Sequence, residues 1–145
     1  MIFSKAIEYG IKATVYVAQQ SMNGYRSNLK EISEHIDSPE AFTAKILQQL
    51  VKGGIIHSIK GAGGGFALEL KEMKKTKLAD IVLALDPGFL DSACVLGLKH
   101  CSETNPCPVH HKYKGIKKET LHLLKTTTLL EMSTNLDKGL AYLRN

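Results

Sequence analysis

Residues 37–66 constrain the fold more than any other stretch, because they combine a helix and a glycine-rich hairpin. Ser38 is a suitable N-cap, Pro39 a suitable first helical residue, and the pair Gly53-Gly54 a stop signal, so a helix is predicted between them. At about 100° per residue, this helix has two unlike sides. One side is apolar: Phe42, Ile46, Leu47, Leu50 and Val51. The other is small at its start, then polar and basic: Ala41, Ala44, Lys45, Gln48 and Lys52.

The second side suits the floor of a DNA major groove. Short side chains permit close approach, glutamine can pair with adenine edges, and lysine can reach guanine or phosphate. An ordinary solvated helix face is the alternative interpretation. The candidate DNA-binding residues, including those of the hairpin described next, are Ser38, Ala41, Ala44, Lys45, Gln48, Lys52, Lys60 and Gly63.

A β-hairpin is predicted directly after this helix. A β-branched run, Ile55 to Ile59, precedes the glycine-rich turn 60–65, and apolar residues then alternate with others from Phe66 onward. From residue 41 through 68 the sequence contains no aspartate or glutamate, so helix and hairpin offer a basic or neutral surface to a polyanion. The glycine run matches neither a P-loop, which needs Lys-Ser or Lys-Thr after its last glycine, nor the dinucleotide fingerprint.

Helical patterns flank this stretch on both sides. A first helix is expected over 2–22, and a second over 29–36 with Asn28 as N-cap. After a polar connector over 71–77 come a helix over 78–85, a loop over 89–109, and two C-terminal helices. The first of these two carries Tyr113, Ile116, Leu123 and Leu124, and the second opens at Thr128 and carries Leu129, Leu136, Leu140 and Leu143.

This order predicts a mainly α protein with a small β-hairpin wing. Residues 1–77 would form a winged helix-turn-helix DNA-binding region. Residues 78–145 would form a cysteine loop and dimerisation helices within the same compact unit. We expect a homodimer on a palindromic operator in double-stranded promoter DNA, since protein and operator symmetry go together in this class. Helices that pack back on their own domain are the alternative.

Composition limits the remaining possibilities. The 145 residues are 43% hydrophobic, which is enough for one hydrophobic core. The formal net charge of +5 is modest and does not indicate a basic tail. Charged residues interrupt the N-terminal apolar pattern, so neither a signal peptide nor a membrane segment is expected, and the protein should be cytoplasmic. The sequence contains no nucleophile–base pair or cofactor fingerprint that would indicate an enzyme.

The loop contains all three cysteines, Cys94, Cys101 and Cys107, and His110 follows the last thiol by three positions. An odd number of crowded thiols argues against a disulfide framework. An iron–sulfur cluster tolerates this wide spacing, whereas structural zinc usually takes cysteines in close pairs. Three interpretations stay open: a cluster, a zinc site that would stabilise an interaction domain, and unliganded thiols.

Taken together, these motifs resemble the Rrf2 family of bacterial transcription regulators. The resemblance runs nearly end to end, through Ser4-Lys5, Tyr9-Gly10, Ile32-Ser33-Glu34, Phe42, Ile46-Leu47, the wing 60–66, the three-cysteine loop and Thr127-Thr128-Leu129. It implies a DNA-binding dimer whose cysteines hold a [2Fe-2S] or [4Fe-4S] cluster, which can be absent from purified protein, and which reports iron–sulfur, redox or nitric-oxide status. The family's cysteine-metabolism repressors imply a cluster-free or thiol-responsive alternative.

The resemblance leaves the fourth ligand open. His110 stands where the family's cluster-assembly regulators have a ligating histidine. Glu8 stands where its nitric-oxide sensors use a carboxylate from the partner subunit. This sequence has Ala44 where the cluster-assembly regulators have a glutamate that takes part in choosing between operator classes. The resemblance therefore does not imply which class of operator this protein binds.

Overall fold

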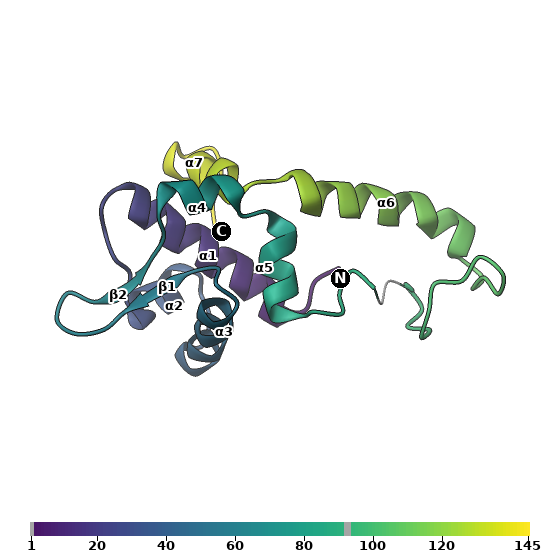
Figure 1. Ribbon diagram of the computed structural model, residues 1–145, viewed down its shortest axis with the longest axis horizontal. Coiled ribbons are helices and arrows are strands. Elements are labelled where there is room, and N and C mark those ends of the chain that lie inside the picture. Colours follow the sequence, from purple (N-terminus) through teal and green to yellow (C-terminus); the bar gives the residue numbers. More distant parts are fainter. Residues whose placement is uncertain (1, 92–93) are drawn as a thin grey trace.

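A computed structural model describes residues 2–91 and 94–145, so Met1 and residues 92–93 of the predicted cysteine loop lie outside the described residues. Its helices and strands follow the predicted order, with one additional helix, α4, between the hairpin and the next predicted helix (Figure 1). They are α1 (Lys5–Met22), α2 (Leu29–His35), α3 (Glu40–Lys52), β1 (His57–Ile59), β2 (Gly65–Ala67), α4 (Leu70–Lys75), α5 (Leu78–Leu85), α6 (His110–Thr126) and α7 (Leu129–Asp137). Strands β1 and β2 pair antiparallel, with Ser58 opposite Phe66.

Capping residues set several helix ends. The Ser4 side chain accepts a hydrogen bond from the Ile7 backbone N–H, so α1 begins at Lys5 and not at residue 2 as predicted. Asn28 caps α2 as predicted, and Thr128 caps α7 through the Glu131 N–H at 3.1 Å.

The last helix ends earlier than predicted. Gly139 lies in the left-handed region at φ 69°, and the Leu140 N–H donates to the Asn135 carbonyl. This C-terminal cap terminates α7 at Asp137, because glycine adopts such a conformation without steric cost. Leu140 and Leu143 therefore follow the helix and are not part of it.

The start of α3 also differs from the prediction by one residue. The Pro39 carbonyl already accepts the Thr43 N–H at 2.9 Å, which makes Pro39 the N-cap and Glu40 the first helical residue. The Ser38 hydroxyl is hydrogen-bonded to the Thr43 hydroxyl, and Ser38 does not act as the N-cap. The prediction erred because it used N-cap preference alone, without the competing Thr43 side chain.

The connector predicted over residues 71–77 is wrong, because most of it forms α4. The Glu72 carboxylate accepts the Glu69 N–H at 3.0 Å in a reciprocal capping arrangement at the start of this helix. Met73 is buried on its inner side. The many lysines are the exposed face of a short amphipathic helix.

Helix α1 forms the centre of the molecule and packs against α3, α5 and α7. The main core includes Val17, Leu50 and Leu129, which are fully buried. A second cluster joins Ile7, Leu78, Ala79, Val82 and Leu124. Because α7 packs on α1, the C-terminal region shares one hydrophobic core with the N-terminal region. The predicted boundary between the two regions, at residues 77 and 78, stays a prediction.

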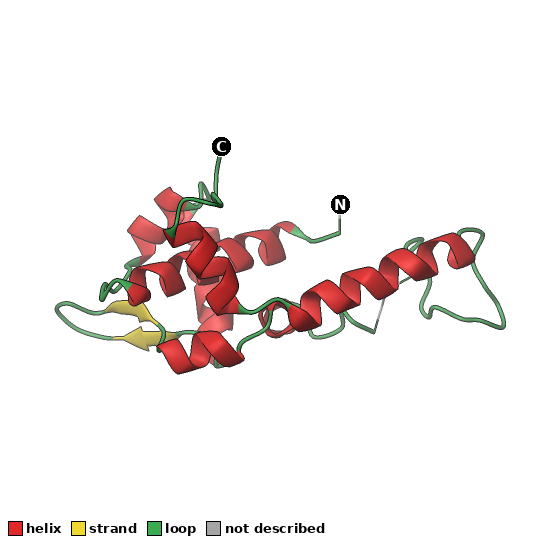
Figure 2. Ribbon diagram, turned by 90° about the horizontal axis from the view of Figure 1, so that it is seen from above, coloured by secondary structure: helices red, strands yellow, loops and turns green. Residues whose placement is uncertain are grey.

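Helix α6 extends from this body as an arm, with the cysteine loop beside its outer part (Figures 1 and 2). At its base, Lys77 and Thr128 form an isolated antiparallel bridge. The Leu78 N–H donates to the Thr127 carbonyl, and the Leu129 N–H donates to the Thr76 carbonyl, both at 2.9 Å. Across the described ranges, 2–91 and 94–145, no helix is long and apolar enough to cross a membrane.

Candidate nucleic-acid interface and cysteine loop

Helix α3 divides into a buried side and an exposed side. Thr43, Ile46, Leu47 and Leu50 are buried in the core. The exposed positions include Ala41, Lys45, Gln48 and Lys52, with Ala44 half-buried at the margin; Glu40 and Gln49 are exposed as well. The structure therefore places the predicted groove-facing residues on one continuous outer surface.

Contacts at the start of α3 fix its direction. The Phe42 ring packs edge-on against the Tyr9 ring of α1, with 5.7 Å between centroids. Ser38 is half-buried, and its N–H donates to the Ser33 carbonyl at 3.0 Å. Ser38 thus belongs to the turn that holds α2 and α3 together, and its predicted DNA contact stays a prediction.

The wing has a compact glycine tip. Lys60 is exposed where the chain leaves β1, and the Gly64 N–H donates to the Gly61 carbonyl at 3.0 Å. Gly63 is exposed at φ 72°, a conformation that favours glycine. The two predicted wing residues, Lys60 and Gly63, therefore lie on the same exposed loop.

The segment before α2 belongs to the wing, which the sequence did not predict. Ser27 exchanges two backbone hydrogen bonds with Phe66, at 2.8 and 3.1 Å. Arg26 Nη1 donates to the Gly63 carbonyl at 3.0 Å. Arg26 is thus a surface cation on the wing, and no local sequence signal could have shown this pairing over 37 positions.

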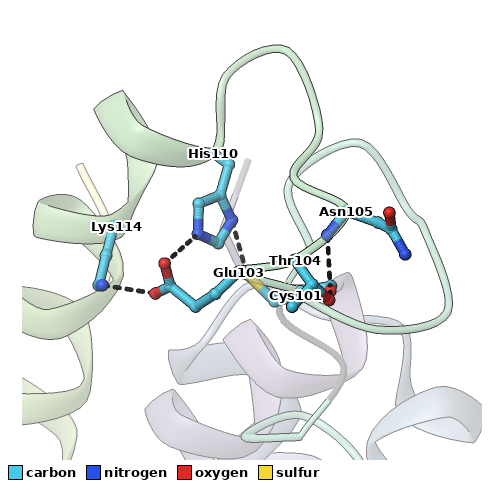
Figure 3. A network of polar contacts seen from close by, with 7 residues as sticks. Cys101, Glu103, Thr104, Asn105, His110 and Lys114 are labelled. Atoms are coloured by element: carbon cyan, nitrogen blue, oxygen red, sulfur yellow. Dashed lines mark hydrogen bonds and ion pairs between the residues drawn. The ribbon is translucent and has the colours of Figure 1, made fainter.

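His110, the first residue of α6, is the centre of a network of polar contacts with the cysteine loop (Figure 3). Its side chain is 3% exposed, and its Nδ1 lies 3.3 Å from Cys101 Sγ. Glu103 approaches the opposite nitrogen, Nε2, at 3.6 Å and also binds Lys114. Among the described residues, Nε2 has no hydrogen bond of ordinary length, and the Glu103 carboxylate is the group that faces it.

Cys94 is the thiol whose surroundings favour its ionised form. The pKa of Cys94 lies below its usual range, because the backbone of Leu98 and Leu96 hydrogen-bonds to its sulfur, with a smaller contribution from the Cys107 thiol. Cys101 is the thiol that contacts His110. Within the described parts of the chain, no three cysteine, histidine or carboxylate side chains converge as a metal site requires.

Glu8 lies on α1, away from the Cys101–His110 pair. Its carboxylate pairs with Lys5 at 2.9 Å. It also lines a cavity of about 820 Å³ together with Cys94 and Tyr113. Of the two candidates for the fourth ligand, His110 contacts Cys101, and Glu8 shares the lining of this cavity with Cys94.

Comparison with known proteins identifies the family. The Rrf2 family model, described as an iron-dependent transcriptional regulator, matches residues 3–135. The chain belongs to the Rrf2 family. An Aquifex aeolicus protein whose name places it among HTH-type transcriptional regulators is 35% identical to this Rrf2 chain, over 91% of each. The HTH-type transcriptional regulator IscR of Yersinia pestis is 26% identical, over 89% of this chain and 77% of the relative.

Solved structures agree with this fold. CymR, the global cysteine regulator of B. subtilis, gives a TM-score of 0.74 at 22% identity, over 91% of this chain and 95% of that one. T. potens IscR gives 0.72 at 22% identity, over 96% and 90%. The predicted winged helix-turn-helix class is confirmed. This Rrf2 protein is a DNA-binding transcriptional regulator and not an enzyme.

Proposed function

We propose that this Rrf2 regulator binds palindromic promoter DNA as a homodimer and holds an iron–sulfur cluster in its cysteine loop. The observation that carries the DNA-binding part is the exposed face of α3. It combines small residues with Lys45, Gln48 and Lys52, and lies in a stretch without an acidic residue from 41 through 68. Such a face can enter a major groove without repelling the phosphates.

Each end of this face has a different task. Ala41 and Ala44 leave room for close approach of α3 to the base edges. Gln48 offers an amide that can pair with adenine, and Lys45 and Lys52 can reach guanine or phosphate. The base contacts would set sequence preference, while Lys60 on the wing would add charge that is independent of sequence.

The dimer is supported by an apolar stripe on α6. Val109 at the N-cap of α6, and Ile116 and Leu123 within the helix, are spaced by seven residues and are 36%, 57% and 53% exposed. Heptad spacing of exposed apolar side chains is typical of a helix that pairs with another helix. The occupant we propose is α6 of a second copy, and the resulting two-fold axis would match a palindromic operator.

The donors in the loop fit an iron–sulfur cluster chemically. Cys94, Cys101 and Cys107 would supply three thiolates, and the buried His110 already turns its Nδ1 toward the Cys101 sulfur. We favour His110 as the fourth ligand because it already contacts Cys101; Glu8, beside Cys94, is the alternative. When bound, the cluster would supply a centre that responds to iron, redox state or nitric oxide.

Selection of duplexes from a randomised DNA pool tests the DNA-binding proposal. The protein should enrich a palindromic site, and variants of the α3 face should lose it while a Lys138→Gln control keeps it, because Lys138 lies at the end of α7. Enrichment of no sequence would contradict the proposal.

Anaerobic purification with an optical spectrum and iron and sulfide analysis tests the cluster. Alanine at any one of the three cysteines should remove the colour, and His110→Ala should change the spectrum or stability of the cluster. The same change in Glu8→Ala alone would assign the carboxylate instead. Stoichiometric zinc in colourless protein would support a zinc site, and metal-free protein with reactive thiols would support a thiol-responsive regulator.

A further inference from the structure

Arg26 is bound to the wing, although it precedes α2 and is remote from the wing in sequence. Its Nη1 donates to the Gly63 carbonyl at 3.0 Å. The next residue, Ser27, pairs with Phe66 through two backbone hydrogen bonds. The wing is therefore the β1–β2 hairpin with a short third segment beside β2, and Arg26 reaches from that segment to the glycine tip.

Most of the guanidinium remains available. An arginine carries five N–H donors in a fixed plane, and the contact with Gly63 uses one of them. Arg26 is exposed. Among the ion pairs of the described residues, none neutralises its charge. Lys60 leaves the same tip on the β1 side, so two cations flank one glycine loop.

The hydrogen bond to Gly63 also limits the motion of the loop. Gly61, Gly63 and Gly65 all have positive φ, and glycine-rich loops lose much conformational freedom when they order. A donor fixed at the Gly63 carbonyl holds this loop in one shape before it meets DNA. The same contact orients the guanidinium plane, so that its remaining donors have a defined direction.

We propose that Arg26 is a second wing cation, which binds a backbone phosphate of the operator while it fixes the wing tip through Gly63. This rests on the proposed DNA-binding function. Phosphate is the acceptor we assign because a planar guanidinium can bind its oxygens in pairs. A phosphate contact contributes equally on every sequence, so Arg26 adds affinity and does not select bases.

Two replacements of Arg26, read through the salt slope, separate its charge from its hydrogen bond. Arg26→Gln removes the charge, and the shorter glutamine side chain also gives up the hydrogen bond that Nη1 makes with the Gly63 carbonyl; the salt slope reports the charge alone. Arg26→Lys keeps the charge. Lys138→Gln is the matched control, since it removes a cation from α7, which lies on the side of the body opposite α3 (Figure 1).

Affinity for the selected operator and for an unrelated duplex is then measured over a range of salt concentrations. Arg26→Gln should weaken the affinity for both duplexes about tenfold. It should also reduce the magnitude of the slope in a plot of log K against log salt concentration by about 0.9, the value expected for one phosphate contact. Arg26→Lys should keep the slope. The double variant with Lys60→Ala should lose about twice as much slope.

An Arg26→Gln variant with wild-type affinity would overturn the inference. Weaker binding with an unchanged slope would also overturn it, because Arg26 would then only hold the loop. Thermal unfolding of each variant confirms that it is folded. If the wild type binds neither duplex, the proposed function itself fails, and with it this inference.

Discussion

Replacing Gly65 with alanine should disrupt the attachment of the wing to the segment before α2. Gly65 has φ 137°, and a Cβ there would lie 2.7 Å from the Ser27 carbonyl oxygen. An L-residue in such a conformation costs about 1 to 3 kcal/mol. Separation of Ser27 from Phe66 removes two hydrogen bonds, each worth about 0.5 to 1.5 kcal/mol. The expected loss of unfolding free energy is therefore about 2 to 6 kcal/mol.

Gly61→Ala is the matched control in the same loop. Gly61 has φ 92°, but an added Cβ would meet nothing within 4 Å among the described residues. Its cost should be limited to the strained backbone, about 1 to 2 kcal/mol. Urea unfolding of both variants measures the difference. If Gly65→Ala is no more destabilising than Gly61→Ala, the close approach of Ser27 to the wing is not a feature of the folded protein.

Three further predictions concern the DNA face and the arm. Lys45→Ala and Gln48→Ala should each weaken operator binding in gel shifts, and Gln48→Ala should also relax base choice by roughly 1 to 3 kcal/mol; unchanged sequence preference would refute the assignment of α3. Lys60→Ala should reduce the magnitude of the salt slope by about 0.9, and an unchanged slope would place the wing away from the duplex. Ile116→Asp should convert the dimer to monomer in analytical ultracentrifugation, because a buried charge at the α6 seam would be unpaired; a persistent dimer would exclude this stripe as the interface.

The sequence predicted those parts of the fold that local signals determine. The helix–turn–helix order, the hairpin and the cap at Thr128 all follow from periodicity and turn residues within a few positions. The two faces of α3 were also correct, because Ile46 and Leu50 are buried while Lys45 and Gln48 are exposed.

What the sequence missed depends on contacts between distant residues. The helix α4 was overlooked because its several lysines made residues 71–77 look like a polar connector. The burial of Met73, which makes the helix amphipathic, depends on tertiary packing and could not be predicted from the local sequence. Arg26 gained its place on the wing through a partner 37 positions away. In the cysteine loop, sequence spacing could not show that the Cys101 thiol lies against the His110 ring.

The bridge between Lys77 and Thr128 has a consequence for the order of folding. It joins the two ends of residues 78–127, so these residues form one long loop of the chain. Closing a loop of that length costs on the order of 3 to 4 kcal/mol of chain entropy. Packing of α7 on α1 has to meet this cost of closure, whereas residues 5–75 form their contacts over shorter separations. Leu129 should therefore reach the core late, and truncating its side chain should accelerate unfolding while leaving the folding rate nearly unchanged.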